Sequence, residues 1–218
     1  YVRLGLSPMV NLKIFSTRSF TNGITIMTLY FMGVTSIWVL VALYIQIGDG
    51  RSALQSACFG IPAALLSAYA AHWAGSRVAK LGRKLVIGGL LLALLGLGLS
   101  IVVVALHEAG ILSIWWLLVS LAFIGAGQGV VISPNQTLTL AEVPLDYAGS
   151  SGAIMQTGQR IGTAIGIAVI TAATFSTLAV ATWATAMAVG FGLVSLVVVL
   201  ALVVALKDLR DRRQAEST

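Results

Sequence analysis

Arg160 has the clearest chemical potential in this sequence, because it interrupts an uncharged run long enough to cross a bilayer, GAIMQTGQRIGTAIGIAVI, residues 152–170. In a helix, Gln156 and Thr163 fall within about 60° of its direction. An arginine inside a membrane usually faces the bundle interior, a wet cavity or a carboxylate. Two roles are open: Arg160 contacts a substrate or coupling ion, or it is a structural tie to helix carbonyls or a carboxylate.

The opposite face of the same helix carries only small residues, in a G-x-x-x-G-x-x-x-G series formed by Gly158, Gly162 and Gly166. Packing drives helix association in lipid, and small residues allow two backbones to approach closely. The pattern therefore predicts a helix with a polar side and a tightly packed side.

Two further groups of residues could contact a ligand. Gln128, with Asn135 about two turns further on, could line a cavity, and an interhelical hydrogen bond is the alternative that such residues more often form. Tyr30 and Trp38, with Met32 between them, could form an aromatic, deformable lining for apolar molecules. Lipid-facing or packed positions are the alternative for these three side chains.

Composition indicates the solvent in which these residues act. Hydrophobic residues make up 58% of the 218 and charged residues 9%, against roughly 45–50% and 25% in soluble domains. Continuously apolar runs, without the alternation of barrel strands, predict an all-α integral membrane protein. Six spans are expected, at residues 20–45, 53–75, 85–106, 113–136, 148–173 and 182–206.

Lysine and arginine predict the orientation of these spans. Three basic clusters fall on one side if every run crosses: Arg3, Lys13, Arg18; Arg77, Lys80, Arg83, Lys84; Lys207, Arg210, Arg212, Arg213. Cytoplasmic loops carry such an excess, so we expect a multi-pass protein of the cell membrane with both termini in the cytoplasm. The net charge of +6 then follows from topology, and we expect no nucleic-acid partner.

Neither catalysis nor a metal site is expected. Cys58 is the only cysteine, and His72 and His107 belong to opposite ends of the predicted bundle. Glu142 and Asp146 flank a loop without histidine or cysteine nearby, whereas an enzyme needs such groups to converge. We therefore expect no cofactor, no metal and no enzymatic activity.

The loop GSRVAKLGRK, residues 75–84, resembles a motif of the major facilitator superfamily, G-x-x-x-D-[RK]-x-G-[RK]-[RK]. It matches at Gly75, Lys80, Gly82, Arg83 and Lys84, while Ala79 replaces the acidic residue. The resemblance implies a loop that takes part in conformational change. Its degenerate form is typical of the second half of these proteins. Positive-inside charge alone is the alternative explanation.

A longer stretch, residues 123–170, is similar to the fourteen-helix drug:proton antiporter branch of that superfamily, and residues 44–65 resemble the connection between two spans of the same half. The resemblance implies the C-terminal half of a transporter, with a lead-in at 1–19, a half-transporter domain at 20–206 and a tail at 207–218. Two three-helix repeats, 20–106 and 113–206, are expected to be related by inverted symmetry. The partners implied are the lipid bilayer, the missing N-terminal half and a small-molecule substrate.

The function that this resemblance implies is secondary active transport, in the form of proton-coupled efflux of amphipathic small molecules. The six predicted spans hold no mid-membrane acid, so a titrating carboxylate would come from the other half. Two alternatives stay open: a solute or metabolite permease of the same superfamily, and a non-catalytic membrane assembly protein.

Overall fold

The all-α prediction is confirmed by the structure, a computed structural model that describes residues 15–141, 143–144 and 147–216. No strand occurs among these residues, and six helical segments are long and apolar enough to span a membrane. The elements are α1 (Arg18–Leu43), a π-helical turn η3 (Tyr44–Gly48), α2 (Ala53–Cys58), α3 (Ile61–Gly75), α4 (Val78–Leu81), α5 (Arg83–Glu108), a 3₁₀ turn η4 (Ile114–Trp116), α6 (Leu117–Leu140), α7 (Ala148–Leu178) and α8 (Trp183–Glu216).

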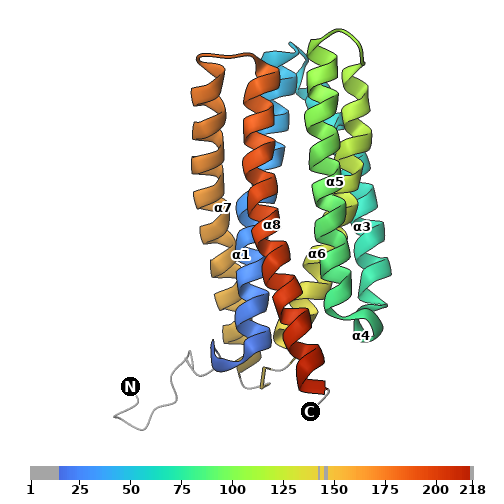
Figure 1. Cartoon of the computed structure of the whole chain (residues 1–218). Coiled ribbons are helices and arrows are strands. Elements are labelled where there is room, and N and C mark those ends of the chain that lie inside the picture. Colours follow the sequence, from blue (N-terminus) through green and yellow to red (C-terminus); the bar gives the residue numbers. More distant parts are fainter. Residues whose placement is uncertain (1–14, 142, 145–146, 217–218) are drawn as a thin grey trace.

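The long helices run roughly parallel to one another in a single bundle (Figure 1). Helices α7, α1 and α8 form one side and α5, α6 and α3 the other, while α8 packs on α5 and α1 on α6 across the middle. The core between them is made of side chains such as Tyr30, Phe191 and Leu97, all of them fully buried. Helices that are far apart in the sequence, such as α1 and α8, therefore pack directly against each other.

Local sequence explains where several of these helices begin and end. Ser52 and Gln55 form a reciprocal capping box at the start of α2, which satisfies backbone donors that a helix leaves open. Gly82 has a φ of +50° between α4 and α5, and Gly110 has a φ of +73° just beyond α5. Side chains with a Cβ rarely adopt this left-handed region, so glycine suits both turns.

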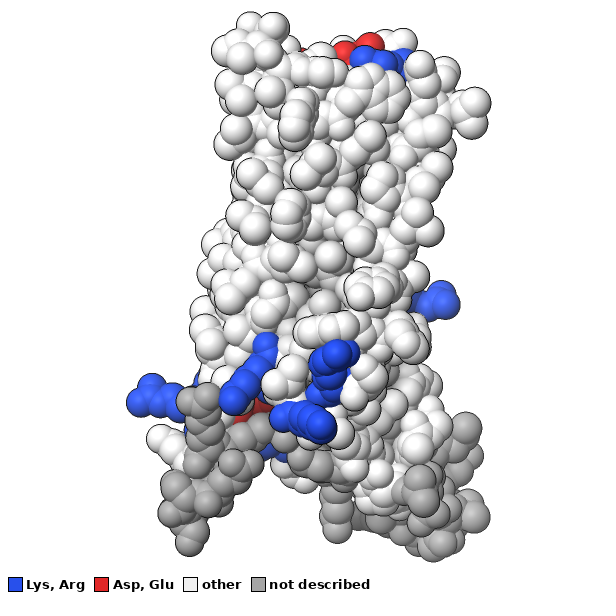
Figure 2. Space-filling model, turned by 90° about the vertical axis from the view of Figure 1, so that its right-hand side faces the viewer, with Lys and Arg blue, Asp and Glu red and all other residues white. Residues whose placement is uncertain are grey.

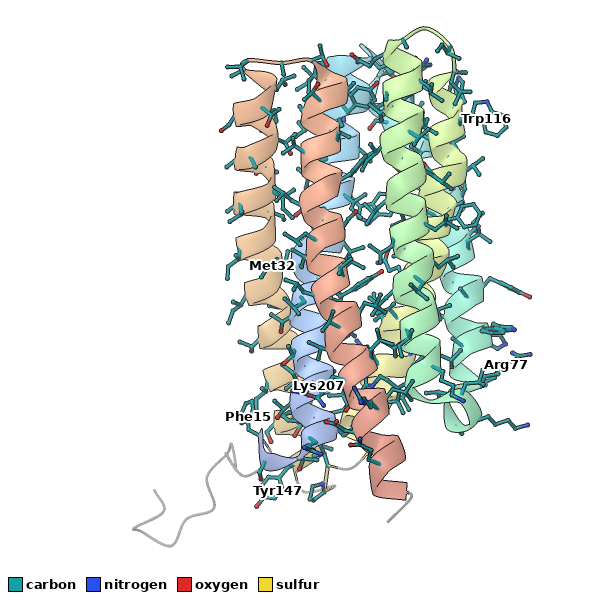
Figure 3. All side chains as sticks on the ribbon, in the orientation of Figure 1. Phe15, Met32, Arg77, Trp116, Tyr147 and Lys207 are labelled. Carbon is teal, nitrogen blue, oxygen red and sulfur yellow. The ribbon has the colours of Figure 1, made fainter. Side chains whose placement is uncertain are left out.

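Basic residues gather at one end of the bundle, while the long middle section is almost uncharged (Figure 2). The labelled side chains agree: Arg77 and Lys207 lie at this basic end, and Trp116 lies near the opposite end (Figure 3). We call the end of the bundle that holds Arg77 and Lys207 the basic end, and the end near Trp116 the opposite end (Figure 3). Basic clusters that are separate in the sequence thus lie at one end of the bundle (Figure 2), as expected if each predicted span crosses the bundle once.

Several boundaries differ from those expected, most of all the end of α8. Helix α8 continues to Glu216, well past the predicted end of the sixth span at residue 206, because KDLRDRR is charged but consists of residues compatible with a helix. The second span is interrupted between α2 and α3. Arg3 and Lys13, most of the predicted lead-in, and Glu142 and Asp146 lie outside the described residues, as do the side chains of Arg212 and Arg213.

Candidate functional site

A cavity of about 520 Å³ opens on the face formed by α1, α3 and α6. Trp38 enters it from α1 and Gln128 from α6, and both side chains are half-buried. The remaining lining is small: Gly60, Ala63, Ala64, Ser67, Ala68 and Ala71. The cavity therefore combines one aromatic side chain and one amide with a smooth wall, which is typical of a site for an apolar molecule with few polar groups.

Close approach of α6 to α3 forms the wall of this cavity. A Cβ on Gly125 would lie 2.2 Å from the Ala63 carbonyl oxygen, and a Cβ on Gly129 would lie 2.2 Å from that of Ser67. No side chain fits at these distances, so glycine allows the two backbones to touch.

A smaller cavity of about 350 Å³ adjoins the first, since Trp38 and Gly60 line both. Its polar groups include Gln46 of η3 and Ser56 of α2, and the Gln46 Nε2 atom donates to the Ser56 Oγ atom at 3.5 Å. Trp38 thus lies between two hollows, on the half of α1 that is nearer the opposite end.

A third hollow, of about 510 Å³, lies between α1 and α7, and we call it the α1–α7 groove. Its lining residues are Ile24, Ser150, Ala153, Ile154, Thr157, Gly158 and Ile161. Ile24 and Trp38 are separated by fourteen residues of α1, which places them within about 40° of one another around the helix. The three hollows therefore follow one face of α1 along the bundle.

The glycines of α7 lie against α1. A Cβ on Gly162 would be 2.3 Å from the Thr28 carbonyl oxygen, and one on Gly166 would be 1.8 Å from that of Met32. Gly158 meets the side chain of Thr28 instead, with its nearest atom at 2.8 Å. Small residues on α7 therefore permit backbone contact with α1.

The polar stripe of α7 divides between two environments. Gln156 and Arg160 are exposed. Thr163 is half-buried, with its Oγ1 atom 3.4 Å from that of Thr35 on α1. Gln159 is the buried polar residue of this stretch, at 5% exposure, although sequence reasoning did not select it. The structure thus leaves Arg160 on an open side of α7, away from the seam with α1.

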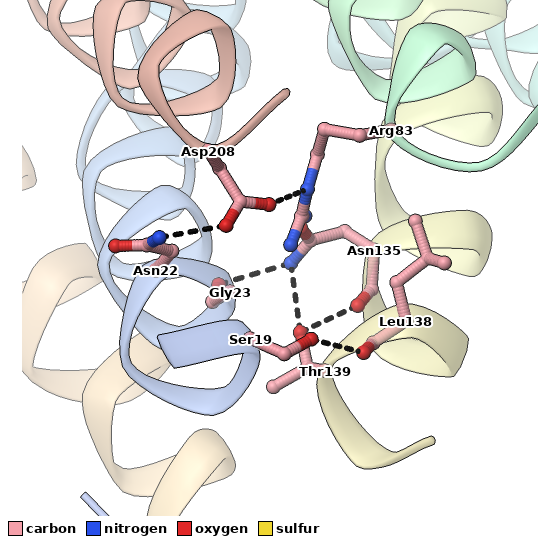
Figure 4. Close-up of polar contacts among 8 residues, drawn as sticks. All are labelled: Ser19, Asn22, Gly23, Arg83, Asn135, Leu138, Thr139 and Asp208. Atoms are coloured by element: carbon pink, nitrogen blue, oxygen red, sulfur yellow. Dashed lines mark hydrogen bonds and ion pairs between the residues drawn. The ribbon is translucent and has the colours of Figure 1, made fainter. Parts of the chain in front are cut away.

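Arg83 lies in a buried polar cluster at the basic end (Figure 4). Its Nε atom donates to the Asp208 Oδ2 atom of α8 at 2.6 Å, and its Nη1 atom donates to the Asn135 amide oxygen of α6. Asn22 of α1 donates to the other Asp208 oxygen at 2.7 Å. One guanidinium thereby connects α5 with α8 and α6, and the carboxylate extends the connection to α1.

Backbone groups complete this cluster. The Asn135 Nδ2 atom donates to the Gly23 carbonyl oxygen at 3.0 Å, and the Ser19 Oγ atom donates to the Leu138 carbonyl oxygen at 2.9 Å. Burial of an ion pair is costly unless further hydrogen bonds satisfy its atoms. The bond from Arg83 to Asn135 and the bond from Asn22 to Asp208 do so, and the backbone contacts hold Asn135 and the neighbouring helix ends in place. Asn135 is therefore an interhelical bridge in this structure rather than a lining residue of the cavity with Gln128.

The other members of the loop motif have different surroundings. Gly75 ends α3 and Gly82 forms the turn before α5, while the side chains of Lys80 and Lys84 are exposed. Of the three basic side chains in the motif, Arg83 alone is buried.

Tyr30 takes the packed position that was the alternative to a cavity lining. Its side chain is fully buried in the core and lines none of the three hollows described above. Tyr30 precedes Trp38 by eight residues, which turns it about 80° around α1 from the cavity face and toward neighbouring helices. Of this aromatic pair, Trp38 lines two of the hollows described above and Tyr30 lines none of them.

A second polar cluster at the opposite end was not foreseen from sequence. His107 Nε2 lies 2.9 Å from an Asp49 carboxylate oxygen, and Arg51 pairs with the other oxygen. Arg51 also lies over the Trp115 ring, 5.1 Å from its centroid. Partial burial raises the pKa of Asp49, but hydrogen bonds from His107 and Arg51 outweigh it and hold that pKa below its ordinary value. The cluster therefore links the segment between η3 and α2 to the end of α5 and to η4.

Asp208 and Asp49 were missed for related reasons. Asp208 stands in a strongly basic segment beyond the predicted sixth span, and Asp49 stands in a short predicted loop. Their partners are distant in sequence, so only three-dimensional proximity reveals the pairs. Among the described residues, no three His, Cys, Asp or Glu side chains are grouped as metal ligands.

Comparison with known proteins agrees with this architecture. Residues 3–167 match the Major Facilitator Superfamily. A "Probable actinorhodin transporter" of Streptomyces coelicolor is 28% identical over 169 residues, which cover 77% of this chain and 29% of that protein. "Lincomycin resistance protein LmrB" of Listeria innocua is 29% identical over 163 residues, covering 74% of this chain and 34% of the relative.

"Multidrug resistance protein Stp" of Mycobacterium tuberculosis is similar at 26% identity over 169 residues, 77% of this chain and 30% of that protein. The aligned part of the chain thus spans about a third of the length of these curated relatives. A bundle of six membrane-spanning helices, half of the fold of this superfamily, fits that coverage. Its helices and its sequence match together show that the chain belongs to the Major Facilitator Superfamily.

Proposed function

We propose that this chain is the C-terminal half of a secondary transporter that exports amphipathic small molecules by a proton-coupled mechanism. The observation that carries the proposal is the series of three hollows along one face of α1, lined by small and apolar residues with Trp38 and Gln128 among them. The volume of each lies within the range of about 300–1,000 Å³ that suits drug-sized ligands. The names of the relatives, which include antibiotic and multidrug resistance proteins, favour such substrates.

The partner in this proposal is the other half of the transporter. In the most apolar stretch of each span, only 22% of residues are buried for the α2–α3 segment and for α7, against 33–50% for the other four spans. These two segments flank the face that carries the hollows. A second set of helices placed there would close the cavities into a central pathway and cover Trp38 and Gln128.

Orientation and coupling belong to the same proposal. Positive-inside charge favours a cytoplasmic basic end in the cell membrane, so both termini would be cytoplasmic. Among the described residues, the acidic ones lie near the two ends of the bundle, at Asp49, Glu108, Asp208, Asp211 and Glu216. A proton-coupling carboxylate would therefore be supplied by the other half.

The cluster around Arg83 suits a mechanical role in transport. It connects α1, α5, α6 and α8 at one level of the bundle, so these helices would move as a unit when the pathway changes access. Catalysis plays no part in this proposal. A permease of the same superfamily is the second candidate, because an open cavity suits import as well as export. A non-catalytic membrane assembly protein is the third, and the named relatives favour it least.

Reconstitution of the native protein that carries this chain tests the proposal. Proteoliposomes with an imposed pH gradient are assayed for movement of a fluorescent amphipathic probe, with intravesicular pH followed in parallel. We expect Trp38→Ala and Gln128→Leu each to reduce flux by at least about tenfold, an amount equivalent to about 1.4 kcal/mol. Trp116→Ala removes an exposed tryptophan from outside the cavities and serves as the control.

Three results would decide among the candidates. Flux that is unchanged in both cavity variants would show that the cavity is not the pathway. Probe movement without proton movement would remove the antiport mechanism, and movement of polar solutes in preference to the probe would favour the permease. Absence of any flux in the wild type would favour the assembly protein.

A further inference from the structure

Arg160 is a cation far from both ends of its helix. It lies about 18 Å along α7 from the start of that helix at Ala148, at 1.5 Å per residue. Its side chain is exposed, and none of the hydrogen bonds or ion pairs among the described residues involves it. The acidic side chains that the structure describes, those of Asp49, Glu108, Asp208 and Asp211, lie near the ends of the bundle, and none of them lies at the level of Arg160.

The α1–α7 groove runs beside Arg160. Ala153 and Thr157, which line the groove, fall within about 60° of Arg160 around α7 and within two turns of it. The groove holds about 510 Å³, and its main surfaces are the apolar side chains of Ile24, Ile154 and Ile161. Arg160 therefore stands at the rim of an apolar hollow.

The hydroxyl groups that line the groove do not compete with Arg160 for an anionic ligand, because their protons are already donated to backbone carbonyl oxygens. The Ser150 hydroxyl donates to the Tyr147 carbonyl oxygen at 3.0 Å, and the Thr157 hydroxyl donates to the Ala153 carbonyl oxygen at 2.9 Å. Both protons are thus used within α7. Arg160 is then the cationic donor available at the rim, among the described residues, to a group bound in the groove.

We propose that the α1–α7 groove and Arg160 form a binding subsite for amphipathic small molecules that carry a negative charge, such as a carboxylate or sulfonate. The apolar body packs against Ile24, Ile154 and Ile161, and the anionic group pairs with the guanidinium, whose planar donors match two carboxylate oxygens. This inference rests on the proposed transport function and specifies the charge of its substrates. The groove continues the face of α1 that carries Trp38, so the occupant is a molecule that enters the pathway.

A pair of probes with the same apolar body isolates the charge. N-dansyl-phenylalanine is an anion at neutral pH, and its methyl ester is uncharged. Binding is measured by dansyl fluorescence with the native protein in phosphatidylcholine liposomes. We expect Arg160→Gln to weaken binding of the acid at least about tenfold while changing binding of the ester less than about twofold, with Arg160→Lys intermediate for the acid. Arg210→Gln makes the same charge change at an exposed position of α8 and is the matched control.

Several outcomes would overturn the inference. Equal weakening of both probes, or a larger loss of thermal stability in Arg160→Gln than in Arg210→Gln, would identify Arg160 as a structural tie. Equal binding by the variant and the wild type would place Arg160 outside the site. Failure of the wild type to bind the acid while it binds or exports the ester would reject the anionic class and leave the transport proposal standing. If Arg160→Gln weakened binding of the acid in phosphatidylcholine liposomes but not in liposomes that contain phosphatidylglycerol, the groove would be assigned to anionic lipid.

Discussion

At the scale of single residues, the basic side chains of one motif have different roles because one is buried and the others are exposed. Arg83, Lys84 and Lys80 all read as positive charge near a membrane surface, yet Arg83 turns into the bundle, where Asp208 and Asn135 receive its hydrogen bonds. The difference arises because Arg83 occupies the first turn of α5, on the side that faces α6 and α8. Sequence identifies the basic position, and packing selects the residue that forms the tie.

The first prediction concerns this tie. Arg83→Gln removes the guanidinium that pairs with the buried Asp208 carboxylate, and breaking a buried pair in this way costs about 3–5 kcal/mol. We expect a large fall in the thermal unfolding midpoint in detergent, measured by tryptophan fluorescence. Lys207→Gln removes an exposed charge next to Asp208 in sequence and should change stability by less than about 0.5 kcal/mol. Similar midpoints for the two variants would show that the cluster does not stabilise the bundle.

A second residue-scale prediction follows from the lowered pKa of Asp49. A carboxyl whose pKa is lower in the folded state stabilises it fully above the ordinary value of about 3.9, and this contribution is lost as the pH falls through the lower folded pKa. Asp49→Asn should therefore lower the unfolding midpoint at pH 7 and flatten its decline as the pH falls below about 4. Unfolding midpoints measured across that range test this.

Asp211→Asn is the control for Asp49→Asn. Asp211 pairs at 3.9 Å with Arg18, whose side chain is 78% exposed, and such surface pairs contribute little. An acid profile of Asp49→Asn that is parallel to the wild type and to this control would contradict the assigned role of Asp49.

At the scale of elements, α7 shows how one helix serves two requirements. Gly162 and Gly166 contact the backbone of α1 and Gly158 the Thr28 side chain, while Arg160 and Gln156 lie on the open side. Three residues of one helical stripe are enough for the contact, because each removes the side chain that would separate the axes. The groove beside this seam exists because α7 keeps its larger residues, Ile154 and Ile161, at the edge of the contact.

The element-scale prediction compares two glycines of α7. A Cβ at Gly166 would lie 1.8 Å from the Met32 carbonyl oxygen, whereas a Cβ at Gly152 would meet nothing within 4 Å. Gly166→Ala should push α7 from α1 and reduce both folding yield and unfolding midpoint. Gly152→Ala should be neutral or stabilising by up to about 1 kcal/mol, since alanine favours helix. Yield and midpoint of the purified variants check this, and equal effects would mean that α7 does not require close contact with α1 at Gly166.

At the scale of the whole molecule, the distribution of charge is the main evidence for orientation. The basic end carries lysine and arginine from three segments that are far apart in sequence, while the middle of the bundle is almost uncharged (Figure 2). Insertion with the basic end in the cytoplasm follows the positive-inside rule.

The whole-molecule prediction tests that orientation by labelling. With Cys58 replaced by serine, a single cysteine at Ala109 should react with a membrane-impermeant maleimide added to intact cells, because this exposed residue lies at the opposite end. A cysteine at Lys80, exposed at the basic end, should react only after the membrane is permeabilised. Reaction at position 80 in intact cells would reverse the topology.

The sequence by itself determined the membrane environment, the six spans and the all-α class, because these depend on run length and on the need of every backbone group in lipid for an internal partner. It also indicated the family through the basic loop and residues 123–170, and it selected Trp38 and Gln128 before their cavity was known. Tertiary structure decided which side chains meet. Asp208 with Arg83 and Asp49 with His107 are far apart in the chain, and Tyr30 points into the core instead of a hollow. Local periodicity fixes the angle of a residue around its own helix, whereas its partners depend on how neighbouring helices pack, which involves contacts across the whole chain.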